Sequence, residues 1–275
     1  MSYWLVNIIF VLFLLYFLRT NRHGLHMLQL EHYYKDRYIK WMENNIRNIF
    51  NIKKIFLLII SSIVFVLGYV EIAATLTILT YLLLNFTFRK KKEKKAFVVT
   101  SRVRRQFITY IILIILMGIL VNVFNDSYSI IFLNVLAIIS YVFVYIVALI
   151  NTPTEKYINN GFCKKAANAL KAIPDFKVIG ITGSYGKTST KHIINTIISQ
   201  KYNSLMTPES YNTTMGVVRT VNEKLKPTHQ LFVCEMGAKY NGDIKEICDI
   251  VHPNFAVITA IGPQHLDTFK TVENV

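Results

Sequence analysis

The 275-residue sequence contains only three cysteines, and their arrangement limits the sites that they can form. Cys163, Cys234 and Cys248 are odd in number and lack the spacing of a metal-binding motif. They therefore exclude a cysteine-based metal centre. Because proteins of oxidising compartments use cysteine in disulfides, so few thiols are typical of a reduced cytoplasm.

Charged side chains are missing from five long stretches in the first half of the chain. No Lys, Arg, Asp or Glu occurs in residues 3–18, 55–70, 72–88, 107–124 and 128–150. The first stretch lacks the preceding basic residue and the following cleavage site of a signal peptide. Since about 20 apolar residues span a bilayer, we expect an α-helical transmembrane domain of about five helices over residues 1–150. The alternatives are buried core helices and, in the first hairpin, a single tilted or re-entrant passage.

Acidic residues are scarce, with 16 Asp and Glu against 31 Lys and Arg, and the net charge is +15. The basic excess lies in two loops, residues 19–54 and 89–106. With five spans both loops fall on one side, which the positive-inside rule makes cytoplasmic. We therefore expect a multi-pass protein of the plasma membrane whose second half is cytoplasmic. The basic loops would then contact membrane lipid and not nucleic acid.

The second half of the chain alternates short apolar runs with helical patterns. Residues 151–175 predict a connecting amphipathic helix, and three apolar strands follow within residues 176–275. The helix expected after the first strand would turn four isoleucines inward, namely Ile193, Ile194, Ile197 and Ile198. The next would bury Ile244, Ile247, Cys248 and Val251. Alternating strands and helices predict an α/β domain with a parallel sheet.

A glycine-rich turn, GITGSYGKTSTK, joins the first of these strands to its helix. Such a turn points backbone N–H groups at phosphate oxygens, and the helix dipole favours negative charge there. Lys187 would pair with the β- and γ-phosphates, and Thr188 would place its hydroxyl on Mg²⁺. The strict phosphate-loop pattern fails because Ile181 stands where its first glycine belongs, so a structural turn is the alternative.

Three ordered motifs resemble the Mur ligase family of ATP-dependent enzymes. The phosphate loop of that family, T-G-x-x-G-K-T, matches residues 182–188, and CEMGAKYNGDI and AIGPQHLDTF resemble its later motifs. The resemblance is closest to the type that adds D-alanyl-D-alanine to a muramoyl tripeptide, and it begins after Ile150. It implies a partial parallel-sheet, P-loop-type central domain over residues 176–275, truncated at its C-terminus.

The resemblance also implies roles for individual residues. ATP would be held by Gly183, Ser184, Tyr185, Gly186, Lys187, Thr188 and Ser189. Thr188, Glu235 and His265 would bind Mg²⁺, and Lys187, Glu235 and His265 would be catalytic. A strand-end cap is the alternative for Glu235, and a satisfied core or turn residue is the alternative for His265.

The stretch TPESYNTTMGVVRTVNEKL resembles the segment that lines the acceptor-substrate pocket in this family. Asn212, Thr213 and Thr214 would then contact substrate or phosphate. The alternative is a helix N-cap, since Asn and Thr are favoured before the first turn of a helix.

By resemblance, ATP would convert a substrate carboxylate to an acyl phosphate, and an amine would displace the phosphate to form an amide. The implied partners are a UDP- or lipid-linked muramoyl peptide of the cell wall and an amino acid or dipeptide. Five expected spans occupy the place of the family's UDP-binding domain. The chain also ends before the usual C-terminal domain. A membrane-anchored ATP-binding protein without ligase activity is therefore the alternative, whereas the nearly uncharged spans disfavour a transporter.

Overall fold

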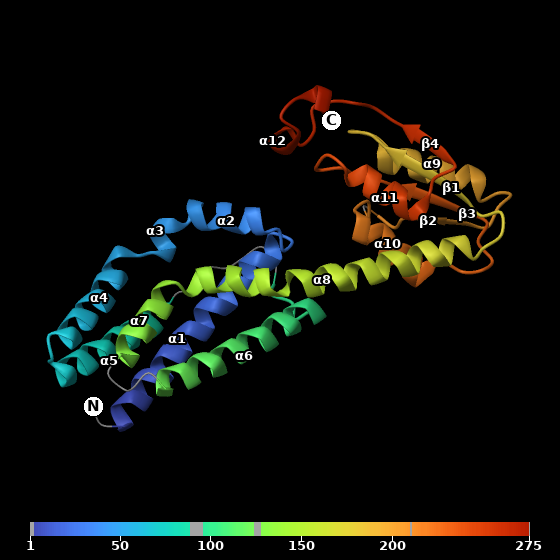
Figure 1. Ribbon diagram of the computed structural model, residues 1–275. Helices are drawn as coiled ribbons and strands as arrows, with labels where there is room; N and C mark the ends of the chain where they lie inside the picture. The colour runs from blue at the N-terminus through green and yellow to red at the C-terminus, as the bar shows by residue number, and fades with distance from the viewer. Residues whose placement is uncertain (1–2, 89–95, 124–127, 210, 275) are drawn as a thin grey trace. The chain divides into compact units, whose positions relative to one another are not determined.

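The computed structural model describes residues 3–88, 96–123, 128–209 and 211–274, and the chain divides into two compact units, Met1–Pro153 and Thr154–Val275 (Figure 1). Residues 89–95 of the expected basic loop and the turn at residues 125–127 lie outside the described residues. Each unit is described separately below.

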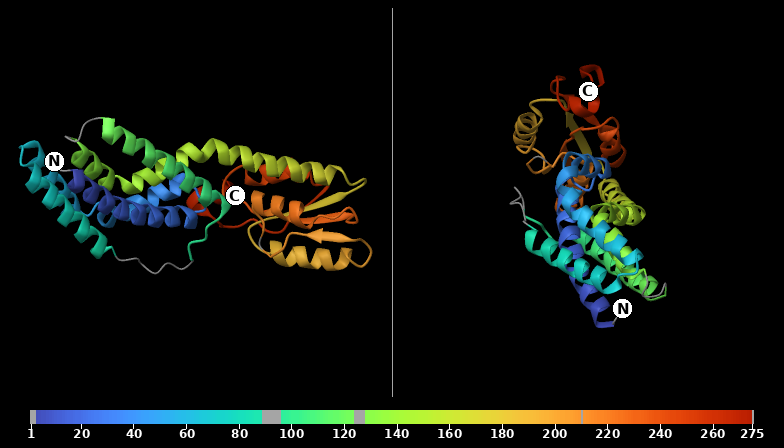
Figure 2. Two further views of the ribbon diagram at one scale, coloured as in Figure 1. Left: turned by 90° about the horizontal axis from the view of Figure 1, so that it is seen from below. Right: turned by 90° about the vertical axis from the view of Figure 1, so that its left-hand side faces the viewer.

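The first unit is built of helices, as its long apolar runs predict. They are α1 (Tyr3–Leu30), α2 (Lys35–Asn44), α3 (Ile46–Ile49), α4 (Ile52–Val66), α5 (Val70–Thr87), α6 (Ser101–Val123), α7 (Ser129–Ile138) and the first part of α8 (Ser140–Lys171). Helix α5 packs against both α4 and α1 (Figure 2). The turn between α4 and α5 is possible because Gly68 adopts a φ of 90° and its N–H caps the carbonyl of Phe65.

The helix ends differ from the expected spans. Helix α1 continues past residue 18 to Leu30, and the expected span 128–150 is broken between α7 and α8, which meet at an angle of 79°. Among the described residues, three helices are long and apolar enough to cross a membrane, Trp4–Leu30, Ile46–Val66 and Val70–Thr87. The bent pair α7 and α8 would make a fourth span if counted as one. These helices are candidate membrane spans by their length and composition only.

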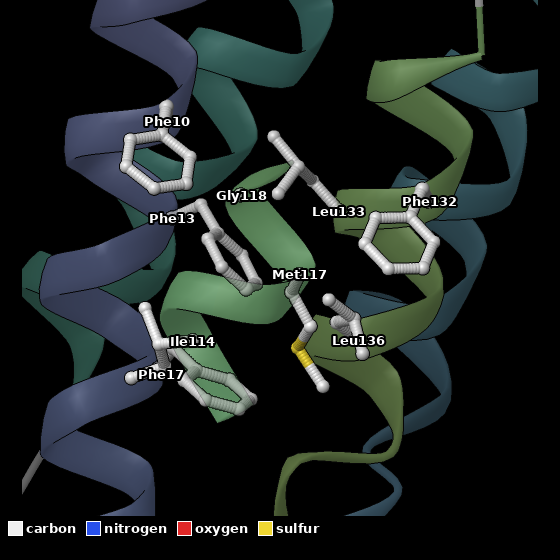
Figure 3. A pocket seen from close by; sticks show the side chains of 9 residues that line it. All are labelled: Phe10, Phe13, Phe17, Ile114, Met117, Gly118, Phe132, Leu133 and Leu136. Carbon is white, nitrogen blue, oxygen red and sulfur yellow. The ribbon is translucent and has the colours of Figure 1, made fainter. Parts of the chain in front are cut away.

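The core of the first unit contains a small apolar pocket between α1, α6 and α7 (Figure 3). Its lining residues are Phe10, Phe13, Phe17, Ile114, Met117, Gly118, Phe132, Leu133 and Leu136. None of these side chains carries a polar group that could orient a ligand. We therefore interpret the pocket as a small gap in the packing of the core.

One buried polar cluster ties three helices of this unit together. The Tyr81 hydroxyl of α5 donates to Asn134 Oδ1 of α7 at 3.0 Å. Asn134 Nδ2 in turn donates to the hydroxyls of Ser61 and Ser62 on α4, at 2.9 and 3.0 Å. Because a buried amide is costly unless it is hydrogen-bonded, this cluster fixes how α4, α5 and α7 align.

The second unit confirms the predicted parallel sheet. Its strands are β1 (Lys177–Thr182), β2 (Ser204–Met206), β3 (Leu231–Glu235) and β4 (Phe255–Ile258), in the order β2-β3-β1-β4. All neighbouring strands are parallel. The helices are α9 (Lys187–Ile198), α10 (Thr214–Lys224), α11 (Asp243–Val251) and α12 (Leu266–Phe269), with a 3-10 turn at Val272–Asn274. The register pairs Ile181 with Glu235, which brings the carboxyl ends of β1 and β3 together.

Helices cover both faces of the sheet. Apolar residues of β1 and β3 share one core with residues of α10, α11 and the end of α8, among them Val178, Phe232, Val218, Ile247 and Leu170. Helix α9 has no residue in that core and packs against β1, β2 and β3. The face predicted for residues 241–253 is confirmed, since Ile247 and Val251 are buried and Ile244 and Cys248 pack against the same core.

The prediction for the inward face of α9 was half wrong. Ile193 is 60% exposed and Ile197 is 66% exposed, whereas Ile194 and Ile198 are partly covered. A helix repeats every 3.6 residues, and the buried Lys191 sets which stripe of α9 faces the sheet. Ile194 and Ile198, three and seven residues further on, lie on that stripe.

The expected connecting helix over residues 151–175 is not a separate element. Helix α8 runs without interruption from Ser140 to Lys171 through Pro153. A proline inside a helix removes one backbone hydrogen bond, and its ring crowds the carbonyl four residues earlier. Val147 and Ala148 before it pack in the first core, and Ala166 and Leu170 after it pack in the second, so both halves of the helix are held by packing.

Candidate functional site

The turn between β1 and α9 depends on two glycines in the left-handed half of backbone space. Gly183 has a φ of 137° and Gly186, the residue before α9, has a φ of 81°. A Cβ atom at Gly183 would lie 2.3 Å from Thr259 Oγ1 and 3.0 Å from the backbone of Ala260. The chain therefore passes too close to the end of β4 for any side chain at position 183. The first turn of α9 leaves its backbone N–H groups free of helical partners and directed into this turn.

Ser184 and Tyr185 use their side chains to fasten the turn to the segment that follows β4. The buried Ser184 hydroxyl donates to the carbonyl of Gly262 at 2.9 Å and accepts from its N–H at 3.1 Å. The Tyr185 hydroxyl donates to the carbonyl of Pro263 at 3.0 Å. These two side chains thus shape the turn, and the N–H of Ser184 also donates to the carbonyl of Ala260 at 2.6 Å.

Lys187 and Thr188 begin α9 and point in different directions. The Lys187 ammonium folds back over the turn and donates to the carbonyls of Gly183 and Ser184, at 2.5 and 3.2 Å. The Thr188 hydroxyl lies 3.2 and 3.1 Å from the two carboxylate oxygens of Glu235. Ser189, the next residue, is exposed in the first turn of the helix.

Glu235 ends β3 and is only 1% exposed. Its Oε1 accepts a hydrogen bond from Asn212 Nδ2 at 3.1 Å, and its Oε2 accepts one from the Lys191 ammonium at 2.9 Å. Its backbone N–H donates to the hydroxyl of Thr207 at 3.0 Å. A buried carboxylate is costly unless it is paired and hydrogen-bonded. The side chain of Glu235 meets this need through Lys191 and Asn212 and so does more than cap the end of a strand.

Lys191 was missed by the sequence prediction. Its side chain is 0% exposed and forms the ion pair with Glu235 inside the unit. One signal was available, since Lys191 stands four residues after Lys187 and three after Thr188, on the same face of a helix that is otherwise rich in isoleucine.

The stretch before α10 divides between the two predicted roles. The side chain of Asn212 reaches Glu235, and its carbonyl accepts from the N–H of Gly237 at 2.7 Å. Thr213 is the N-cap of α10, and its hydroxyl accepts from the N–H of Gly216 at 3.3 Å. The Thr214 hydroxyl donates to Glu246 on α11 at 2.7 Å. The structure thus brings only Asn212 of the three to Glu235.

His265, the third predicted metal ligand, stands on the segment that follows β4. It is exposed, has a φ of 53° and precedes the short helix α12, whose last N–H groups bond to its carbonyl. In the part of the chain that the structure describes, no three His, Cys, Asp or Glu side chains gather as a metal site. Of the predicted metal ligands, Thr188 and Glu235 lie next to each other and both offer oxygen atoms. Two hard oxygen ligands suit Mg²⁺, which keeps waters and phosphate oxygens in its other positions.

Cys234, next to Glu235, is not a reactive thiol. Burial, and to a smaller extent Cys248 and Glu235, raises the pKa of its thiol well above the ordinary value. The thiolate is the nucleophilic form of cysteine, so chemistry at this site has to come from the oxygen and nitrogen groups around it.

We expect Gly183→Ala to destabilise the second unit more than Gly186→Ala. Either alanine pays for a positive φ, about 1–2 kcal/mol in the left-handed region. Only the alanine at 183 also collides with Thr259, which adds roughly 1–3 kcal/mol of overpacking, whereas a Cβ at 186 has its nearest neighbour at 3.9 Å. Thermal unfolding of the two variants measures the difference. Equal losses would show that the segment after β4 gives way freely.

Comparison with known proteins finds similarity in the second unit. Residues 181–275 match the Mur ligase middle domain. The chain is 39% identical over 89 residues to the UDP-N-acetylmuramoyl-tripeptide--D-alanyl-D-alanine ligase of Synechocystis, covering 32% of this chain and 19% of that protein. It is 35% identical over 111 residues to the ligase of the same name from Buchnera aphidicola, covering 40% and 24%. The chain thus spans between a fifth and a quarter of the length of these relatives.

Two solved structures are similar to part of this chain. A crystal structure of MurF from Acinetobacter baumannii is 34% identical, with 42% of this chain and 25% of that chain covered and a TM-score of 0.41. A MurF ligase from Thermotoga maritima in complex with ADP is also 34% identical, with 42% and 27% covered and a TM-score of 0.40.

The predicted localisation, a multi-pass protein of the plasma membrane, is wrong. The relatives that the chain matches are named as UDP-N-acetylmuramoyl-tripeptide--D-alanyl-D-alanine ligases and MurF, and none of these names describes a multi-pass membrane protein. The apolar helices of the first unit were the basis of that prediction, and their length and composition do not show where the protein resides.

Proposed function

We propose that the chain, whose residues 181–275 match the Mur ligase middle domain, is part of an ATP-dependent ligase that forms an amide bond in peptidoglycan precursor synthesis. The observation that carries this proposal is the contact between the Thr188 hydroxyl and Glu235, which ends β3, with the Lys187 ammonium on the turn that follows β1. Ligands of open parallel sheets bind at this edge.

ATP would bind with its phosphates over the turn at residues 183–186. The N–H groups of the first turn of α9 and its dipole favour a phosphate there. The Lys187 ammonium, now bonded to the carbonyls of Gly183 and Ser184, lies at the same turn and would move to the β- and γ-phosphates. Exchanging neutral carbonyls for phosphate oxygens gives this ammonium stronger, charge-assisted hydrogen bonds.

Mg²⁺ would be held by the Thr188 hydroxyl and the Glu235 carboxylate. When bound, the ion would neutralise charge on the phosphates as the γ-phosphoryl group is transferred. Asn212 and Lys191 hold the two oxygens of Glu235 in place, so the carboxylate is oriented before the ion arrives. Binding of a second ion by His265 stays a prediction, because His265 lies on an exposed turn.

In the proposed reaction, a carboxylate oxygen of the acceptor attacks the γ-phosphorus of ATP and ADP leaves, which gives an acyl phosphate. The amine of the second substrate then attacks the acyl carbon, the C–O bond to phosphate breaks, and an amide, phosphate and a proton result. The names of the relatives point to a UDP-linked muramoyl tripeptide and D-alanyl-D-alanine as the two substrates. Of the predicted substrate contacts, Asn212 is the one we retain beside the transferred phosphate.

Phosphate release from ATP tests this function. The assay compares the purified chain, and a version extended through any downstream reading frame, with each substrate alone and with both. The proposal expects release that requires the tripeptide and D-alanyl-D-alanine together. ATP binding without release in every combination would contradict the ligase and favour a protein that only binds nucleotide.

A further inference from the structure

The fully buried Lys191 contacts the site proposed above only through Glu235, and its effect on the affinity for Mg²⁺ goes beyond the function proposed there. Its ammonium donates to Glu235 Oε2 at 2.9 Å and to the backbone carbonyl of Glu209. A lysine is rarely fully buried unless it is paired, because an unpaired charge in the interior is costly. Both hydrogen bonds of this ammonium go to protein groups, so we expect its effect on a ligand to pass through Glu235.

Lys191 joins three separate segments at one point. It belongs to α9, its ion-pair partner ends β3, and Glu209 lies in the segment that follows β2. That same segment carries Thr207, which bonds to the backbone of Glu235, and Asn212, which bonds to its side chain. The lysine therefore holds the carboxylate and the segment around it in a single arrangement.

The Glu235 carboxylate has a defined orientation as a result. Asn212 occupies one side of Oε1 and Lys191 occupies one side of Oε2. The Thr188 hydroxyl lies within 3.2 Å of both oxygens. Each carboxylate oxygen has a second lone pair. The Thr188 hydroxyl now donates to both oxygens, so a cation would bind on that side once the hydroxyl turns its hydrogen away.

We propose that Lys191 is a positioning residue, which holds Glu235 against Thr188 and thereby sets the affinity of the nucleotide site for Mg²⁺. The inference rests on the proposed function, because it needs ATP and Mg²⁺ to bind here. Partners that orient a metal ligand from behind commonly change metal affinity about 10–100-fold when they are removed. Lys187 and Lys191 then have different tasks on one face of α9, the first at the phosphates and the second behind the metal ligand.

The experiment is calorimetric titration of the full chain with a non-hydrolysable ATP analogue, with Mg²⁺ and with EDTA. The variants are Lys191→Met, Glu235→Gln and the two combined, with Lys201→Met as a matched control at an exposed position just after α9. We expect Lys191→Met to weaken binding in Mg²⁺ about tenfold or more and to leave binding in EDTA unchanged. In the Glu235→Gln background, adding Lys191→Met should change binding in Mg²⁺ less than about twofold, because non-additivity marks residues that act as a unit.

The outcomes separate the two claims. Unchanged binding of Lys191→Met in Mg²⁺ would overturn the inference and leave the proposed function standing, as would an equal loss in Mg²⁺ and EDTA. Failure of the unsubstituted chain to bind the analogue at all would overturn the proposed function, and the inference with it. If Lys191→Met fails to fold by circular dichroism, Lys191→Arg, which keeps a buried cation and donor, replaces it. For Lys191→Arg, the affinity for the analogue in Mg²⁺ divided by the affinity in EDTA should stay above the same ratio for Glu235→Gln. Equal ratios in the two variants would overturn the inference.

Discussion

Lys187→Ala is expected to abolish tight nucleotide binding, with affinity falling at least about 100-fold, or roughly 2.7 kcal/mol. The Lys187 ammonium is the positive charge that the structure places on the turn, where it contacts the carbonyls of Gly183 and Ser184. Alanine would leave the turn itself in place, because Ser184 and Tyr185 still fasten it to Gly262 and Pro263. Titration with a Mg²⁺-bound ATP analogue measures the affinity, and thermal unfolding checks that the fold is kept.

Lys201→Ala is the matched control for this variant. It removes the same charge from an exposed position just beyond the end of α9. Since exposed charges are screened over about 8 Å at physiological salt, its effect on binding should be small. Similar losses in the two variants would mean that net charge, and not the turn at residues 183–186, governs binding, and the phosphate-loop assignment would be removed.

Glu235→Ala is expected to be strongly destabilising, by about 3–5 kcal/mol, because it leaves the ammonium of Lys191 buried without its anionic partner. Both side chains of the pair are at most 1% exposed, so water cannot replace the lost carboxylate. Urea unfolding measures the cost. Adding Lys191→Met to this variant should restore most of the lost stability, since replacing both members of a buried ion pair by apolar groups is often neutral.

An exposed ion pair of the same unit provides the comparison. Arg219 and Glu223 face each other on α10 at 3.0 Å with more than half of each side chain exposed. Glu223→Ala should therefore leave the unfolding midpoint unchanged within error. A double variant of Lys191 and Glu235 that is less stable than Glu235→Ala alone would contradict the account, because it would show that the lysine stabilises the unit without the carboxylate.

The order of strands and helices in the second unit could be predicted because each signal is local. The apolar runs that form β1, β3 and β4 are bounded by turn residues. Gly183 and Gly186 supply the positive φ angles of the turn after β1. Strand β2 was not predicted, because three residues are too few to show a period. The predicted inner face of α9 was partly wrong because it was chosen from the isoleucines, whereas the buried residue of this helix is Lys191.

The candidate site could be predicted only in part. Lys187 and Thr188 come after β1 and Glu235 ends β3, and parallel strands bring such positions to one edge of a sheet. The contacts of Lys191 with Glu235 and Glu209 join residues 44 and 18 positions apart, which no local pattern reveals. The first unit shows the same limit, since long apolar stretches correctly predict helices but do not say what covers their exposed surface.

Hydrogen exchange of the backbone amides, with and without a Mg²⁺-bound ATP analogue, tests the central claim most directly. The account predicts that the analogue protects the amides of residues 183–190, at the turn and the start of α9, and those next to Glu235 at the end of β3. Binding with protection elsewhere and none at residues 183–190 would contradict it, because the phosphates would then lie outside the turn between β1 and α9.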